Sequence, residues 1–63
     1  MALHVDEWRR LKKLSKEEMA QKLGVHRNTI TNWENNPSII PIEKAYQMAD
    51  IYGVELNDII FLP

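Results

Sequence analysis

Residues 27–35 of this 63-residue chain carry the side chains best suited to binding another molecule through hydrogen bonds. A helix over 27–35 would turn Ile30 and Trp33 inward. Its outer face would then carry a polar set: Arg27, Asn28, Thr31, Asn32 and Asn35. Exposed helix positions usually carry Glu and Lys, and Asn and Thr are poorer helix formers. Their concentration on one face predicts that this face binds another molecule through hydrogen bonds.

Two short helices joined by a turn are predicted to position that face. Ser15 and Glu18 have the spacing of a capping box, so a helix should begin at Ser15. The apolar residues that follow have the spacing of a helix buried on one side: Met19, Ala20 and Leu23. Gly24 comes next, where a residue in the left-handed conformation best ends a helix. His26 can then cap the helix over 27–35.

Three further helices are predicted, over about Val5–Lys13, Pro41–Tyr52 and Glu55–Phe61. The first would turn inward Val5, Trp8 and Leu11. In the second, an apolar set recurs every third or fourth residue and predicts a core-facing stripe: Ile42, Ala45, Tyr46, Ala49 and Tyr52. The last would bury Leu56, Ile59 and Ile60. Frequent helix ends and the lack of strand signals predict an all-α fold, a compact arrangement of five short helices.

The composition narrows the class of protein. At 63 residues the chain can form one domain, over positions 1–63, with a minimal core. It holds no cysteine, so neither a disulfide framework nor a thiolate metal site is available. No apolar run approaches the roughly 20 residues that span a bilayer, and no secretory signal stands at the N-terminus. We therefore expect a cytoplasmic protein without a membrane partner.

The charge is unevenly distributed along the chain. The net charge of −1 argues mildly against a nucleic-acid partner, because such proteins are usually basic. Residues 1–33, however, carry seven Lys/Arg against four Asp/Glu, a net +3, and residues 34–63 carry one against five, a net −4. A dipolar molecule can present its positive end to a phosphate backbone. An ordinary solvated helix surface would give the same counts, so the charge leaves both interpretations open.

No arrangement of residues predicts catalysis or metal binding. His4 and His26 are far apart in the sequence, with no cysteine or third ligand beside them. Glu17 and Glu18 are adjacent carboxylates, but in the first turn of a helix they are ordinary partners of the helix dipole and the cap. The sequence also lacks a Gly-rich phosphate loop and a nucleophile–base pattern. We therefore expect that the protein is not an enzyme and that it binds no metal, cofactor or small-molecule substrate.

Two runs carry a resemblance to a known family, LSKEEMAQKLGV over 14–25 and ITNWEN over 30–35. They resemble the lambda-repressor-like (Cro/repressor, XRE-type) helix-turn-helix family. Pro41 and the stretches 49–54 and 57–60 match the fourth and fifth helices of that family. The resemblance therefore covers nearly the whole chain, and it implies a five-helix DNA-binding fold with a central helix-turn-helix at about 15–35.

The resemblance implies which residues read bases. In this family the second helix of the motif lies in the DNA major groove, with its N-terminal residues at the base edges. On this chain that is the helix over 27–35, and the matching positions are Arg27, Asn28, Thr31 and Asn32. Arg can donate two hydrogen bonds to guanine, Asn can pair with adenine, and Thr can place its methyl group against thymine. Arg27, in the first turn, could equally hold a phosphate.

The resemblance also implies contacts to the phosphate backbone, which fix the register of a protein without reading sequence. Lys16 and Gln21 occupy the matching positions, and the backbone amides near Ser15 add the positive end of a helix dipole. Further candidates on the recognition helix and its flanks are His26, Thr29, Asn35 and Asn36.

Arg9 and Glu34 resemble the pair that links the first helix of the family to the recognition helix. Glu34 lies at the edge of the predicted buried face of that helix. We expect a partly buried ion pair that sets the angle of the recognition helix. The alternative is a solvated surface pair, which would contribute under about 1 kcal/mol to stability.

Three positions depart from the family pattern. Lys13 and Asn36 stand where the family commonly has Gly. Asn tolerates that backbone conformation, whereas Lys13 predicts a different exit from the first helix. The loop over 37–40 lacks the Lys or Arg that relatives often place against phosphate, which lowers the expected affinity and leaves the loop open to another role.

The last residues, 59–62, form the apolar run IIFL, which is large for so small a core. Either this run forms a dimer patch, or a continuation of the chain covers it. Relatives commonly bind as two-fold dimers on half-sites about 34 Å apart. We therefore expect a homodimer on DNA, with the C-terminal segment and the loop over 36–41 as candidate contacts.

The preferred interpretation is a sequence-specific transcriptional regulator that binds a double-stranded DNA operator, of phage-repressor or small bacterial regulator type. The alternative is a protein-interaction module on the same fold, antitoxin-like or anti-repressor, that has lost DNA binding. The acidic second half, the uncharged loop and the apolar C-terminus favour the alternative, since fold alone does not fix function. The Arg/Asn/Thr/Asn face favours the first interpretation, because a pure interaction module has no need of it.

Overall fold

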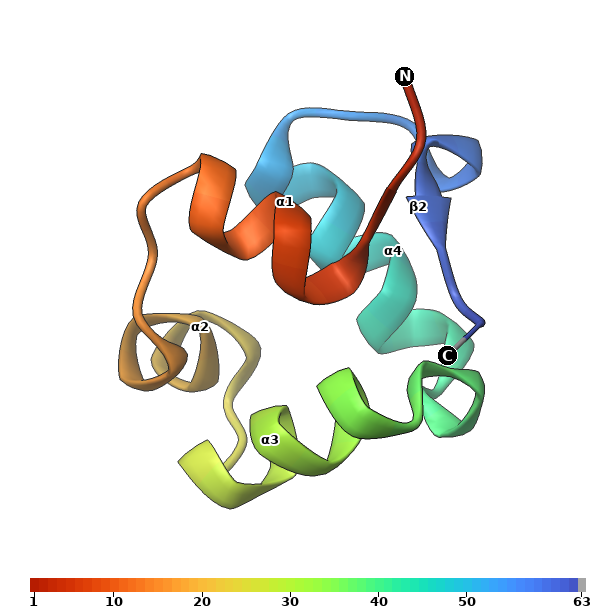
Figure 1. The fold of residues 1–63 in the computed structure, drawn as a ribbon. Coiled ribbons are helices and arrows are strands. Elements are labelled where there is room, and N and C mark those ends of the chain that lie inside the picture. Colours follow the sequence, from red (N-terminus) through yellow and green to blue (C-terminus); the bar gives the residue numbers. More distant parts are fainter. Residues whose placement is uncertain (63) are drawn as a thin grey trace.

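The computed structural model describes residues 1–62. Within them it has four α-helices: α1 (Val5–Leu11), α2 (Lys16–Leu23), α3 (Arg27–Asn35) and α4 (Ile42–Tyr52). Two single 3₁₀ turns follow α3 and α4: η1 (Pro37–Ile39) and η2 (Leu56–Asp58). Figure 1 shows α3 across the bottom of the molecule, with α1 and α4 above it and α2 to one side. Among residues 1–62, every helix is too short or too polar to span a lipid bilayer.

The predicted fifth helix over 55–61 is wrong, and so is the expected lack of strands. The chain makes only the 3₁₀ turn η2 and then extends as strand β2 (Ile59–Ile60), which pairs in parallel with β1 (Leu3–His4). Leu3 lies opposite Ile59 in this register. Two consecutive β-branched residues favour an extended backbone, and the pairing partner lies at the other end of the sequence. The fold is therefore mostly helical rather than all-α.

One tertiary cluster holds the two chain ends against α4. The Trp8 ring on α1 stacks near the Tyr52 ring on α4, with centroids 6.4 Å apart and planes inclined by 19°. Trp8 Nε1 donates a hydrogen bond of 2.7 Å to the backbone oxygen of Asp58, and the Tyr52 hydroxyl donates one of 3.4 Å to that of Val5. Burial raises the pKa of the Tyr52 hydroxyl, which stays a protonated donor. Both aromatic rings are core residues, as Trp33 is, in agreement with their predicted inward positions.

The buried side of α4 is only partly the predicted one. The residues that face the core are Ala45, Met48, Ala49 and Tyr52. Ile42 and Tyr46 were predicted to lie on that face, yet they are 61% and 57% exposed. The long side chain of Met48, 1% exposed, fills the core in their place. The sequence could not distinguish the two arrangements, because more than one set of positions on this helix has the three- and four-residue apolar spacing. Leu11, predicted to point inward from α1, is exposed as well.

The exit from α1 differs from the prediction too. The helix ends at Leu11 rather than at Lys13, and Lys13 has a φ of 58°, in the left-handed region. Its backbone N–H still donates to the carbonyl of Arg10, and that of Leu14 donates to Arg9, each at 3.0 Å. The turn thus keeps the helix-ending hydrogen bonds of a glycine-type cap with a lysine in the strained position. Lys13 therefore adopts the left-handed conformation that a glycine would adopt at this position.

Candidate nucleic-acid interface

Hydrogen bonds within a few residues of each other define where α2 begins, where it ends and how the chain turns into α3. The Ser15 hydroxyl accepts a hydrogen bond of 3.0 Å from the backbone N–H of Glu18, whose carboxylate accepts one of 2.9 Å from the Ser15 N–H. This capping box begins α2. Gly24 ends it with φ 69° and ψ 33°, a left-handed conformation that glycine adopts without strain. The backbone N–H of Val25 then donates to the carbonyl of Ala20 at 3.0 Å, so the chain turns tightly into α3.

His26 caps α3. Its Nδ1 accepts a hydrogen bond of 3.0 Å from the backbone N–H of Asn28. An accepting Nδ1 carries no proton, so the proton of the neutral ring is on Nε2. His26 is exposed, and its Nε2–H can therefore donate to a group outside the protein while Nδ1 holds the helix end.

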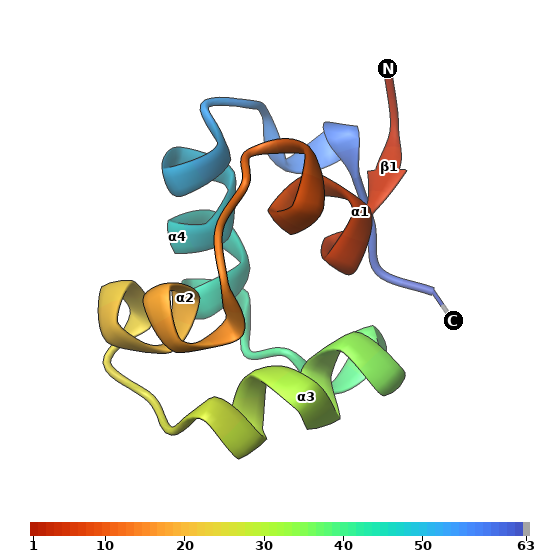
Figure 2. The same ribbon diagram turned by 60° about the vertical axis from the view of Figure 1, so that its left-hand side comes forward.

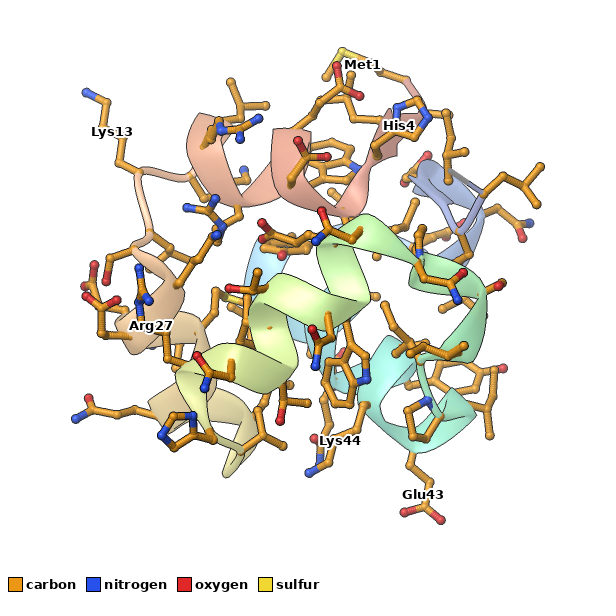
Figure 3. The ribbon with its side chains drawn as sticks, turned by 60° about the horizontal axis from the view of Figure 1, so that its bottom comes forward. Met1, His4, Lys13, Arg27, Glu43 and Lys44 are labelled. Atoms are coloured by element: carbon orange, nitrogen blue, oxygen red, sulfur yellow. The ribbon has the colours of Figure 1, made fainter. Side chains whose placement is uncertain are left out.

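The outer face of α3 is polar and reaches solvent. Ile30 and Trp33 are buried beneath it. The residues predicted to read bases stand on the opposite side: Arg27, Asn28 and Asn32 are exposed and Thr31 is half-buried. Figure 2 shows α3 along the lower edge of the molecule, with one side turned away from the other helices, and Figure 3 views that side directly. The fold therefore leaves this face accessible to a partner.

Two side chains of α2 reach across to α3. Lys16 Nζ donates a hydrogen bond of 3.3 Å to the hydroxyl of Thr31. Glu17 Oε1 accepts a hydrogen bond from Arg27 Nε, and this ion pair is open to solvent on both sides. The cation of Lys16 thus lies beside the proposed base-reading face, and Arg27 leaves α3 on the side of α2, as its label in Figure 3 shows.

The remaining residues predicted to contact phosphate lie around this face. Gln21 on α2 and Asn35 at the end of α3 are exposed, as is Asn36, the residue after α3. Thr29 is half-buried on the flank of α3. Each can present a polar group to solvent, which is what a phosphate contact requires.

Arg9 and Glu34 meet in a nearly buried pair. Arg9 Nε and Nη2 donate to the two carboxylate oxygens of Glu34, at 2.6 and 3.3 Å, and Nη1 donates to the backbone oxygen of Leu14 at 2.9 Å. The two side chains are 10% and 8% exposed. The hydrogen bonds to Glu34 raise the pKa of Arg9, so the guanidinium stays charged. The pair connects α1, the turn before α2 and the end of α3.

Two interactions were not foreseen from the sequence. The sequence predicts only helix-dipole and capping chemistry for Glu17, and its contact with Arg27 depends on how α2 crosses the start of α3. Lys44, the single cation of residues 34–63, donates from Nζ to the backbone oxygen of Leu23 at 2.7 Å. A cation at the C-terminal end of α2 satisfies a helix-end carbonyl and the helix dipole. Neither spacing gives a local sequence signal, because each contact joins two helices.

These features define a small helical protein whose capped helix-turn-helix presents a polar, cation-bearing helix to solvent. The chain belongs to the helix-turn-helix family, whose model matches residues 5–59. The resemblance seen in the sequence is therefore confirmed. This is a family of DNA-binding, non-enzymatic regulators, which agrees with the expectation that the chain is not an enzyme.

The chain is also similar to an uncharacterized HTH-type transcriptional regulator of Methanocaldococcus jannaschii. The two are 36% identical over 52 residues, which is 82% of this chain and 79% of the relative. No solved structure matches the chain significantly.

Proposed function

We propose that this protein is a sequence-specific transcriptional regulator that binds double-stranded DNA and reads the major groove with α3. The observation that carries the proposal is the outer face of α3, where exposed Arg27, Asn28 and Asn32 stand over buried Ile30 and Trp33. Such a helix can enter the major groove while the core holds its other side. The relative described as an HTH-type transcriptional regulator supports the same function.

Each residue of the base-reading set has a role in the proposal. Arg27 pairs with a guanine edge and Asn28 and Asn32 pair with adenine edges. Thr31 contacts either a base or a thymine methyl group. A correct bidentate contact discriminates by about 1–3 kcal/mol, so two or three of them give a useful preference. Specific affinities of this kind are about 10⁻⁸–10⁻¹¹ M.

The phosphate contacts are proposed on the rim of the same face: Lys16, Gln21, His26, Thr29 and Asn35. Lys16 is the strongest candidate, because its ammonium rests on the neutral hydroxyl of Thr31 and its charge remains available to a phosphate. His26 is suited to the same role, since the cap uses Nδ1 and leaves Nε2–H as a free donor on an exposed side chain. Most of these donors are neutral and few are cations, so we expect affinity to depend only weakly on salt. The slope of log K against log salt concentration is about −0.9 for each neutralised phosphate.

We further propose that the protein acts as a homodimer on DNA. Several large apolar side chains are more than half exposed, and three of them follow one another through η1 and the start of α4: Ile39, Ile42 and Tyr46. Leu62 at the C-terminus is 67% exposed. The Cα trace measures 27 × 22 × 18 Å. Two copies on half-sites about 34 Å apart, one turn of DNA, would therefore sit close enough to touch through side chains.

A protein-interaction module is the second candidate. The same exposed apolar residues and the net charge of −4 over residues 34–63 favour it. The phage-repressor or small bacterial type of regulator is a finer assignment, and the archaeal source of the similar regulator does not favour it. A cytoplasmic location follows from the proposed action on chromosomal DNA.

In-vitro selection from a random duplex library at near-physiological salt separates the two candidates. Recovery of one motif is the expected result, and a palindrome would also give the half-site spacing. A folded protein that enriches no sequence would instead support the interaction module. Sedimentation of the protein with and without the selected duplex tests the dimer, and a single copy per palindrome would contradict it.

A further inference from the structure

Arg27 and Glu17 form the one ion pair that links α2 to the proposed base-reading set among residues 1–62. Their side chains are 54% and 64% exposed. An exposed pair of this kind adds little to folding stability. The pair lies at the start of α3, however, and there it influences the orientation of the Arg27 guanidinium.

The neighbouring glutamate makes a useful contrast. The carboxylate of Glu18 accepts the backbone N–H of Ser15 and completes the capping box of α2. Glu17 takes no part in that box, and its carboxylate is turned to Arg27 instead. The cap of α2 is therefore complete without Glu17, and the contact with Arg27 is the interaction that this side chain contributes.

The atoms used in the pair determine what remains for a ligand. Arg27 donates to Glu17 through Nε, and within residues 1–62 its terminal nitrogens Nη1 and Nη2 make no hydrogen bond to protein. A guanidinium is planar and rigid, with five donors in a fixed fork. A hydrogen bond through Nε therefore restricts the orientation of the group and leaves both terminal nitrogens available to a ligand. Two parallel donors are what a guanine edge accepts through O6 and N7.

We propose that Glu17 is a specificity-determining residue that positions Arg27 for bidentate recognition of guanine. This inference rests on the proposed function, which pairs Arg27 with guanine, and adds Glu17 as the residue that positions Arg27 for that contact. A carboxylate so close to DNA also repels the phosphate backbone, so Glu17 lowers affinity for every duplex while it sharpens the preference for one base. An arginine without this partner would be mobile and could bind a phosphate as readily as a base.

The proposal predicts opposite effects of Glu17→Ala on two quantities. Affinity for a random-sequence duplex should rise, because a negative charge near the phosphates is removed. Discrimination for guanine at the position that Arg27 reads should fall by about 2- to 5-fold, the coupling typical of an exposed ion pair. That position is identified as the one where Arg27→Ala loses preference. Both are measured by binding of purified protein to the selected duplex, the three variants that carry another base at that position, and a random duplex.

Two matched variants separate positioning from charge. Glu17→Gln keeps an oxygen that can accept from Nε, so it should retain most of the discrimination that Glu17→Ala loses. Glu18→Gln removes the same charge one residue away while its amide oxygen can still cap Ser15, so it should raise affinity for random duplex without changing base preference. Circular dichroism and thermal melting of each variant establish that it is folded.

Each failure has a separate meaning. If the wild-type protein enriches no sequence, both the proposed function and this inference fall. If it enriches a motif and Glu17→Ala keeps the full guanine preference, the inference alone is overturned. It is also overturned if Arg27→Ala leaves base preference unchanged, or if Glu17→Ala lowers affinity for random and selected duplexes equally.

Discussion

Arg9 and Glu34 share two hydrogen bonds while a third joins Arg9 to the backbone of Leu14. Through these contacts α1 reaches the last turn of α3 and the turn before α2. Both side chains are at most 10% exposed, so the pair differs from the solvated pairs elsewhere on the surface. We propose that it sets the angle at which α3 is presented.

Removing one member of this pair is expected to be strongly destabilising. Arg9→Ala leaves the Glu34 carboxylate buried without a partner, and Glu34→Ala does the same to the guanidinium, each at about 3–5 kcal/mol of unfolding free energy. In a double-mutant cycle the two losses should be far from additive. Urea denaturation of the four proteins measures this. Arg10→Ala, which removes an exposed pair with Asp6, is the control and should cost under about 1 kcal/mol. Additive losses would refute the buried pair.

A substitution at Lys13 is expected to stabilise the fold rather than destabilise it. The φ of 58° at Lys13 is unfavourable for a residue with a side chain, and glycine adopts it freely. Lys13→Gly should therefore stabilise the fold by about 0.5–1 kcal/mol, after the larger unfolded-state entropy of glycine is deducted. The neighbouring Lys12 has a φ of −84°, so Lys12→Gly lacks the gain and should destabilise. Thermal melting of both variants decides the matter, and a lower melting temperature for Lys13→Gly would show that the left-handed turn is not strained.

The helix-turn-helix could be predicted because its signals are local. Ser15, Glu18, Gly24 and His26 each act within four residues of their partners. The C-terminal segment could not, because Ile59 pairs with Leu3 from the other end of the chain. A run of apolar residues after a turn is compatible with a helix or a strand, and only the distant partner decides between them.

The candidate site shows the same division. The outer face of α3 follows from helical periodicity, which places Asn28 and Asn32 one turn apart. The contact between Glu17 and Arg27 depends on the crossing of two helices, and neither residue type nor spacing announces it. The apolar spacing predicts Ile42 and Tyr46 on the buried side of α4, but Met48 satisfies the same spacing. Packing against α1 and α2 decides which side of α4 is buried.

The capping box of α2 should make stability depend on pH in acid. The hydrogen bond from the backbone of Ser15, followed by that with its side chain, lowers the pKa of Glu18 below its usual 4.5. A lowered folded-state pKa stabilises the fold above the unfolded-state value, and this contribution is lost as pH falls through the folded-state pKa. Glu18→Gln does not titrate, so its unfolding free energy should change less between about pH 6 and 3 than that of the wild type. Parallel curves from urea denaturation would exclude a role for the cap.

Base reading and phosphate binding can be separated by their different dependence on sequence. Asn28→Ala and Asn32→Ala should each lose about 1–3 kcal/mol of preference at one base position, because the bidentate contact to adenine is removed. Lys16→Ala should weaken all duplexes alike and reduce the salt slope by about one. Fluorescence anisotropy on the selected duplex and its single-base variants, at several salt concentrations, measures both effects. Thr29→Ala, on the flank of α3, should behave as Lys16→Ala does but leave the salt slope unchanged, since no charge is lost. Uniform weakening of every duplex by Asn28→Ala and Asn32→Ala would mean that α3 holds the backbone and that another element reads the bases.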